Sequence, residues 1–120
     1  MFQTDLSATL QRHEIMRQAE IYHGNMAVVI SEETYDRVTA AKAADELLTI
    51  RGVDASFVIY TKDDGIYMSA RSLGEINVQV ILEALGGGGN STTAGGQVSG
   101  MTAPEAKEKL LAAIESYLND

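Results

Sequence analysis

The chain has 120 residues, a hydrophobic fraction of 45% and a formal net charge of −8. This length suits one globular domain, and the negative charge disfavours long nucleic acid, which normally binds a basic surface. The chain has no cysteine, which excludes disulfides and thiolate chemistry. Because no apolar run reaches the length of a membrane span and no signal peptide opens the chain, we expect a cytoplasmic domain.

The first half of the chain alternates between helical and extended patterns. Apolar spacing predicts a helix over about residues 5–19, and residues 21–30 are predicted to be extended. Met26–Ile30 is a continuous apolar run typical of a buried strand. Ser31–Thr34 is predicted to break this strand before a helix at about residues 36–48, whose small residues would let it lie close to a sheet.

The middle of the chain predicts a β-hairpin followed by a helix. Ser56–Tyr60 is β-branched and aromatic, Asp63-Asp64-Gly65 is a turn signal, and Ile66–Arg71 returns as a strand. Apolar residues at helical spacing then predict a helix over about residues 77–85.

The segment Gly86–Gly96 contains six glycines among eleven residues. Ordered glycine loses much conformational entropy, so it is expected where φ is positive or where another group approaches the backbone closely. A loop of bare N–H groups could bind phosphate, and the alternative is a flexible linker. The segment follows a helix rather than a strand, unlike the dinucleotide fingerprint, and lacks the Gly-Lys-Ser/Thr of a P-loop.

The last part of the chain predicts a short strand at Gly96–Ser99 and a helix that begins at the capping box Thr102-Ala103-Pro104-Glu105. The whole order is α-β-α-β-β-α-loop-β-α. This order predicts an α/β fold with a mixed sheet of about four to five strands and helices packed on its faces.

Arg71 is the first candidate for a binding side chain. It ends a predicted strand shortly before the glycine-rich segment, and strand ends are where α/β sheets bind ligands. Its guanidinium could donate hydrogen bonds to two oxygens of a phosphate while the N–H groups of the loop bind its other oxygens. The alternative is a surface arginine paired with a nearby acid.

The residues indicate no catalytic or metal site. His13 and His23 lack a zinc-ligand spacing and are predicted to be half-buried or surface residues. Asp63 and Asp64 fit a turn better than a metal pair. No histidine is placed to activate a serine nucleophile.

Several segments are informative in combination: Ala43–Leu48, Val53–Ile59, Ser69–Gly74 and Gly86–Gly89, with Phe2–Leu6 and Ala19–Tyr22 at the start. Together they resemble the DHH-associated domain, the C-terminal half of DHH-family phosphodiesterases, and in particular that of the GdpP-type cyclic di-AMP phosphodiesterases. The resemblance covers nearly the whole chain. It implies one DHH-associated domain over residues 1–120, in which residues 1–19 form a leading helix from an inter-domain linker.

The resemblance also implies a function. Such proteins hydrolyse cyclic di-AMP to linear pApA with two Mn²⁺ ions, held by Asp and His residues of a preceding DHH domain. No Asp-His-His occurs in this sequence. We therefore expect a nucleotide-binding lobe, inactive alone, of a membrane-anchored parent protein. Its expected partners are a cyclic or linear dinucleotide and the DHH domain of the same parent chain, and a homodimer is left open.

The resemblance assigns substrate binding to Arg71, Ser72, Gly87, Gly88, Gly89 and Asn90. The first two match the family's Arg-Ser motif, and the three glycines match its glycine motif. Asn90 stands where the family has histidine, and asparagine can donate a hydrogen bond but cannot carry charge. This difference puts the usual substrate in question.

Two other functions remain open from the sequence. One is a single-stranded nucleic-acid-binding module like that of RecJ-like exonucleases, which the charge of −8 disfavours. The other is a regulatory or dimerisation domain whose ligand site has decayed, with Asn90 as the sign of that decay.

Overall fold

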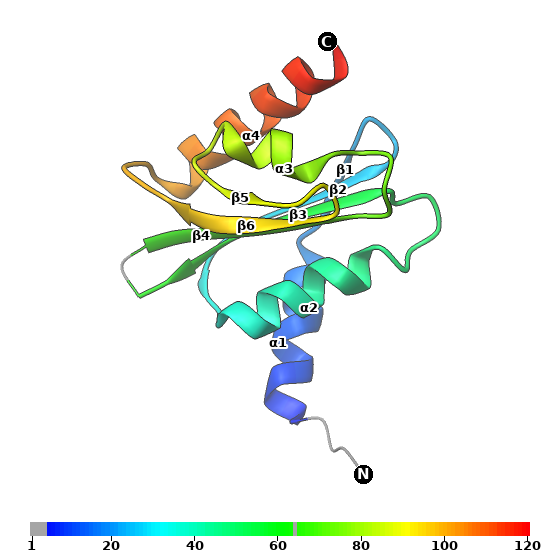
Figure 1. Cartoon of the computed structure of the whole chain (residues 1–120). Coiled ribbons are helices and arrows are strands. Elements are labelled where there is room, and N and C mark those ends of the chain that lie inside the picture. Colours follow the sequence, from blue (N-terminus) through cyan, green and yellow to red (C-terminus); the bar gives the residue numbers. More distant parts are fainter. Residues whose placement is uncertain (1–4, 64) are drawn as a thin grey trace.

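Six strands form one mixed sheet in the computed structural model, which describes residues 5–63 and 65–120 (Figure 1). They are β1 (Glu20–Tyr22), β2 (Met26–Thr34), β3 (Ala55–Lys62), β4 (Gly65–Ser72), β5 (Gly88–Gly89) and β6 (Thr93–Val98). Their order across the sheet is β1-β2-β3-β4-β6-β5. β2 and β3 pair in parallel, and the other neighbours are antiparallel. The predicted α/β class and mixed sheet are confirmed.

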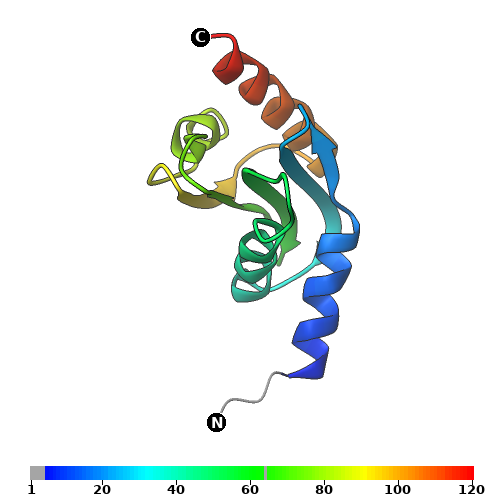
Figure 2. The same ribbon diagram turned by 90° about the vertical axis from the view of Figure 1, so that its right-hand side faces the viewer.

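Helices cover both faces of this sheet. They are α1 (Leu6–Arg17) and α2 (Arg37–Leu47) on one face, and α3 (Val78–Glu83) and α4 (Ala103–Leu118) on the other (Figures 1 and 2). The predicted capping box is confirmed at the start of α4, where Thr102 and Glu105 each accept a hydrogen bond from the other's backbone N–H. None of the helices in the described ranges is long and apolar enough to cross a bilayer.

The sheet has one or two strands more than predicted, for two local reasons. His23 and Gly24 adopt positive φ (54° and 79°), which turns the chain sharply between β1 and β2. The glycine-rich segment contributes β5, which the sequence did not indicate. The predicted break after Ile30 is wrong, because β2 continues through an irregular register until Thr34 pairs with Thr61.

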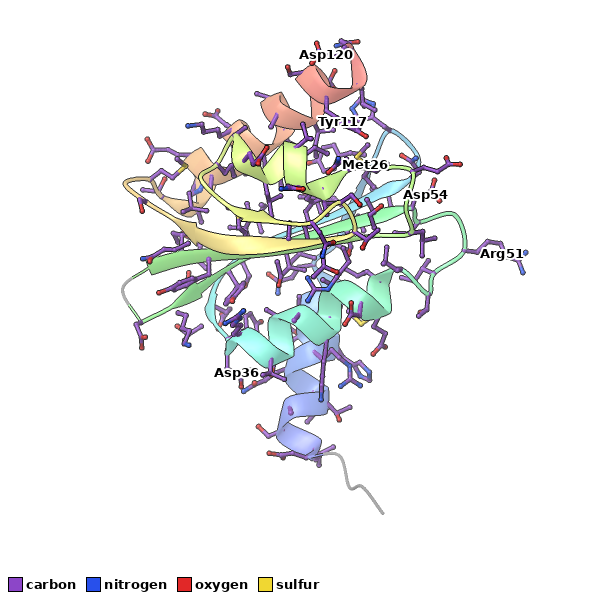
Figure 3. The ribbon with its side chains drawn as sticks, viewed as in Figure 1. Met26, Asp36, Arg51, Asp54, Tyr117 and Asp120 are labelled. Atoms are coloured by element: carbon purple, nitrogen blue, oxygen red, sulfur yellow. The ribbon has the colours of Figure 1, made fainter. Side chains whose placement is uncertain are left out.

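The sheet separates two hydrophobic cores, because side chains alternate along each strand. Phe57 and Ile59 of β3 pack toward α3 and α4, whereas Val58 and Tyr60 pack toward α1 and α2. Figure 3 shows side chains filling both layers. Within the described residues, no buried side-chain nitrogen or oxygen lacks a hydrogen-bond partner. The sheet is therefore a well-packed support for the candidate site on its surface.

Small residues bring α2 close to the sheet. Ala40, Ala43 and Ala44 are fully buried on the side of the helix that packs on β3. The buried Ser56 hydroxyl of β3 donates a 2.7 Å hydrogen bond to the Ala44 carbonyl oxygen. This packing fixes the position of α2 beside β4, and the space next to it is the candidate site.

Candidate binding cleft beside Arg71

An open cleft of about 430 Å³ lies on the α2 face of the sheet, where β4, β6 and β5 extend beyond the helix. Its principal lining residues are Arg37 and Ala41 of α2, Tyr67, Ser69 and Arg71 of β4, Gly88 and Gly89 of β5, and Thr93, Gly95 and Gln97 of β6. Among the described residues that line the cleft, two are arginines and none is acidic. In a chain of net charge −8, this lining favours an anionic ligand.

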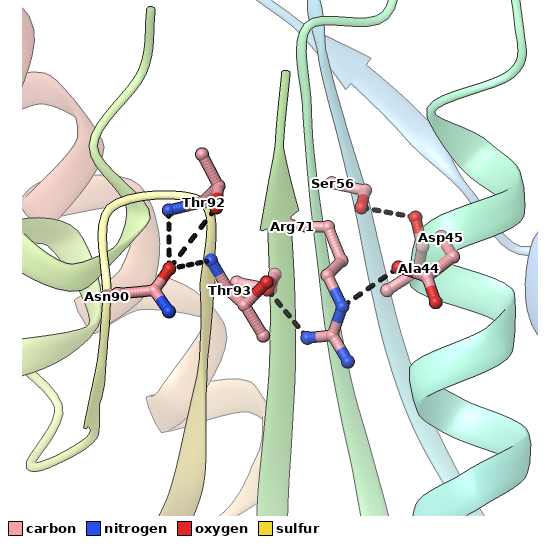
Figure 4. Close-up of polar contacts among 8 residues, drawn as sticks. Ala44, Asp45, Ser56, Arg71, Asn90, Thr92 and Thr93 are labelled. Carbon is pink, nitrogen blue, oxygen red and sulfur yellow. Dashed lines mark hydrogen bonds and ion pairs between the residues drawn. The ribbon is translucent and has the colours of Figure 1, made fainter. Parts of the chain in front are cut away.

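Arg71 lies in the wall of the cleft, held by two hydrogen bonds (Figure 4). Its Nε donates to Asp45 Oδ1 at 2.9 Å, and its Nη1 donates to the Ala70 carbonyl oxygen at 2.9 Å. The Arg71 side chain is 16% exposed and that of Asp45 is 62% exposed. Arg71 is therefore both a cleft residue and the partner of an acid. The part of the chain that the structure describes offers its Nη2 no hydrogen bond.

The glycine-rich segment is a β-hairpin rather than the loop that the sequence predicted. Gly88 and Gly89 of β5 pair with Gly95 and Ala94 of β6, and the strand predicted at Gly96 begins three residues earlier, at Thr93. The prediction failed because most glycines here make room for the protein's own backbone. A Cβ on Gly89 would lie 2.3 Å from the Thr93 carbonyl oxygen, and one on Gly95 would lie 2.8 Å from that of Met68.

Gly88 differs from the other glycines of the hairpin. A Cβ placed on it would meet no atom within 4 Å, and its φ lies outside the left-handed region that favours glycine. It is exposed and lines the cleft. The fold therefore does not require glycine at this position, whereas a ligand that approaches the backbone closely would require it.

The other three predicted site residues lie outside the cleft lining. Gly87 packs at the start of the hairpin, where a Cβ would lie 2.6 Å from Met68 Cε. Ser72 is buried on the opposite side of β4, and its hydroxyl accepts a 3.0 Å hydrogen bond from the Gly74 N–H. The structure thus brings together Arg71, Gly88 and Gly89.

Asn90 closes the turn between β5 and β6. Its Oδ1 accepts hydrogen bonds from the backbone N–H groups of Thr92 and Thr93, both at 3.0 Å, and from the Thr92 hydroxyl (Figure 4). These hydrogen bonds occupy the acceptor oxygen of the Asn90 side chain, and its Nδ2 amide N–H groups are left to donate elsewhere. This structural role of Asn90 was not predicted from the sequence.

Sequence reasoning also missed Arg37 and Tyr67. Arg37, Ala41 and Asp45 recur at every fourth position of α2, and this helical spacing would have placed all three on the side that faces Arg71. Burial raises the pKa of Tyr60, the cross-strand partner of Tyr67, and the positive charge of Arg37 partly offsets this rise. Arg37 therefore lies close to this pair of tyrosines.

A comparison with known families decides which family this fold represents. The model of the DHHA1 domain matches residues 23–120. The chain belongs to the DHHA1 domain family. This is the DHH-associated domain that the sequence motifs resembled, so that prediction is confirmed.

The relatives of this DHHA1 domain include enzymes of cyclic di-AMP turnover. The cyclic-di-AMP phosphodiesterase PdeA of Listeria monocytogenes is 45% identical over 116 residues, which are 94% of this chain and 18% of that protein. The cyclic-di-AMP phosphodiesterase GdpP of Bacillus subtilis is 42% identical over 113 residues, or 90% of this chain and 17% of that protein. The chain thus spans less than a fifth of these relatives' length.

Solved structures share the fold. An exopolyphosphatase-related protein from Bacteroides fragilis superposes with a TM-score of 0.82 at 22% identity, covering 96% of this chain and 36% of its own. RecJ from Thermus thermophilus, crystallised with Mg²⁺, gives a TM-score of 0.67 at 17% identity, covering 90% of this chain and 17% of its own. At these identities the likeness concerns the fold alone.

The family resemblance assigns two Mn²⁺ ions to a DHH domain, and the described residues of this DHHA1 domain do not themselves fit a divalent metal site. Divalent cations need several carboxylate or imidazole ligands gathered at one point. Residues 5–63 and 65–120 contain no group of three or more histidine or acidic side chains that could hold such an ion. No chemical step is therefore assigned to a metal on this chain.

Proposed function

We propose that this DHHA1 domain is the nucleotide-binding lobe of a DHH-type phosphodiesterase that hydrolyses cyclic di-AMP. The observation that carries the proposal is that Arg71 and the open backbone of Gly88 line the same cleft, which has no acidic lining residue among those described. The identity to PdeA and GdpP supports cyclic di-AMP, or its linear product, as the ligand.

In this proposal the chain binds and orients the dinucleotide and does no bond-breaking chemistry. The Arg71 guanidinium donates to phosphate oxygens, and the Gly88 backbone allows an anionic oxygen to approach without meeting a side chain. Mn²⁺ ions would be held by a DHH domain of the same parent chain and would supply the Lewis-acid chemistry of hydrolysis. The 120-residue chain alone is expected to bind weakly and to hydrolyse nothing.

The test is a titration of the 120-residue chain with pApA and with cyclic di-AMP, followed by backbone amide NMR. Amides of Arg71, Gly88 and Gly89 should shift at millimolar ligand, whereas amides of α4 on the opposite face should not. Arg71→Gln should weaken binding at least tenfold, since a hydrogen bond to a charged group contributes about 1.5–3 kcal/mol.

Arg51→Gln provides the matched control for charge. Arg51 is exposed in the turn after α2 and extends away from the body of the protein (Figure 3). This variant makes the same change in net charge and should bind like the unmodified chain. Equal weakening by both variants would show that only net charge matters, and shifts confined to other surfaces would refute the site. A labelled oligonucleotide that binds at the same residues at physiological salt would favour single-stranded nucleic acid instead.

A further inference from the structure

The cleft has two chemically different ends. Along α2, Arg37 and Asp45 are eight residues apart, which is about 12 Å at the helical rise of about 1.5 Å per residue. Along β4, Tyr67 and Arg71 are four residues apart, or about 13 Å. Asp45 bonds to Arg71, and Arg37 lies beside the partner of Tyr67. The helix and the strand therefore run side by side, with Arg71 at one end and Arg37 and Tyr67 at the other.

The end at Tyr67 combines an aromatic ring with two polar planar groups. The Tyr67 ring is half-buried and stacks on the buried Tyr60 ring, with centroids 6.0 Å apart and planes inclined by 30°. Gln97 of β6 pairs directly with Tyr67 and also lines the cleft. Arg37 is exposed, and no ion pair involves it within residues 5–63 and 65–120.

The floor between the two ends is lined by small residues. Ser69 of β4 pairs with Gly95 of β6 at the middle of the cleft, and both contribute small groups. A phosphate alone cannot reach both ends, because they are separated by four residues of extended strand. A ligand that uses the whole cleft therefore needs an anionic group and a planar group joined by a spacer.

We propose that Tyr67, Arg37 and Gln97 form a nucleobase subsite for the nucleotide whose phosphate binds at Arg71 and Gly88. This inference rests on the proposed function and assigns the second half of the same cleft. A base can stack on the Tyr67 ring, which is held in place by Tyr60. The Arg37 guanidinium can stack on the base or donate to its ring nitrogens, and the Gln97 amide can pair with the base edge.

Three probes separate the two ends of the cleft: adenosine, ribose 5-phosphate and adenosine 5′-monophosphate. Each is titrated into the 120-residue chain, with amide shifts, Tyr67 ring resonances and saturation transfer to the ligand as readouts. Adenosine should shift resonances at Tyr67 and Gln97, and ribose 5-phosphate should shift those at Gly88 and Arg71. The monophosphate should shift both sets and bind more tightly than either, with base protons that receive saturation from the Tyr67 ring.

Variants then test the residues of the base subsite. Tyr67→Ala should weaken binding of the monophosphate by roughly 5- to 100-fold, because stacking of a base on an aromatic side chain has about that effect. Ribose 5-phosphate should bind this variant as it binds the unmodified chain. Tyr67→Phe keeps the ring and should retain most of the affinity. Because Tyr67 packs on the core, Tyr67→Ala also removes packing contacts. Arg37→Gln changes an exposed residue instead and should weaken binding of the monophosphate, whereas Val38→Ala on the same helix should leave binding unchanged.

The outcomes distinguish this inference from the proposed function. Equal affinity for the monophosphate and ribose 5-phosphate, with shifts only near Gly88, would overturn the base subsite and leave the phosphate site standing. Adenosine binding at Tyr67 without any effect of phosphate at Gly88 would support the subsite and refute the phosphate site. Absence of binding by all three probes at millimolar concentration would overturn both.

Discussion

Gly88 and Gly89 are neighbours in β5, and alanine should have opposite effects at the two positions. At Gly88 an added Cβ meets nothing within 4 Å, and the backbone is not in the left-handed region. Gly88→Ala should therefore leave the free energy of unfolding unchanged or raise it by up to about 1 kcal/mol. At Gly89, φ is +146° and the new Cβ would lie 2.3 Å from the Thr93 carbonyl oxygen. Gly89→Ala should destabilise the hairpin by about 2 kcal/mol or more.

Gly88→Ala should weaken dinucleotide binding, although it does not lower the free energy of unfolding. The new methyl group would occupy the space through which an anionic oxygen approaches the strand backbone. Displacing this oxygen from the Arg71 guanidinium would lose charge-assisted hydrogen bonds and should weaken dinucleotide binding by roughly 10- to 100-fold. Thermal unfolding measures the first effect, where about 1 kcal/mol corresponds to a shift of about 4 °C for a domain of this size.

Calorimetric or NMR titration with pApA measures the second effect. Ser91→Ala is the control, because Ser91 is exposed in the adjacent turn and does not line the cleft. A stable Gly88→Ala variant with unchanged affinity would refute the idea that the glycine serves the ligand. Loss of folding in that variant would refute the claim that the fold does not need glycine there.

Three further predictions follow from individual contacts. Asp45→Asn should keep a hydrogen bond to Arg71 while removing a negative charge beside the cleft, so titration should show dinucleotide binding tighter by about 2- to 5-fold; weaker binding would mean that the charge of Asp45 positions Arg71. The Thr39 N–H donates a hydrogen bond to Asp36 at the start of α2 and lowers the pKa of this carboxyl below its usual 3.8. The stabilisation provided by the ionised Asp36 carboxylate is therefore present above pH 3.8 and is lost as the pH falls through the lower pKa of the folded state. Asp36→Asn should flatten this acid dependence in unfolding experiments, whereas Asp36→Ala should cost about 1 kcal/mol at neutral pH; identical acid profiles for the unmodified and Asn variants would contradict this. Asn90→Ala should lower the free energy of unfolding by about 1–2 kcal/mol because the turn loses its acceptor, and an unchanged melting temperature would show that those hydrogen bonds contribute little.

Local signals predicted the parts of the fold that local chemistry determines. The hairpin of β3 and β4 and the capping box of α4 were both found, since a turn sequence or a cap acts within a few residues. The continuation of β2 to Thr34 was missed, because it depends on pairing with Thr61 from another part of the chain. Likewise, no local pattern reveals that Gly95 lies against the Met68 backbone.

The candidate site was only partly accessible to the same reasoning. Arg71 was found from its place at a strand end, and the glycines were found from the unusual composition of their segment. Arg71, Gly88 and Gly89 all line the cleft. Arg37 and Tyr67 were missed because each fits an ordinary helix or strand pattern. Only the parallel course of α2 and β4 makes them neighbours, and this is a property of the tertiary fold.

One side of helix α2 packs on β3, and another side forms a wall of the cleft. Its distance from the sheet is set by Ala43 and Ala44, which lie under it with no exposed surface. A bulkier residue there would lift the helix and spread the cleft without touching any residue in it. The volume of the side chain at position 43 or 44 therefore determines the width of the cleft, and so the size of the molecule that fits into it.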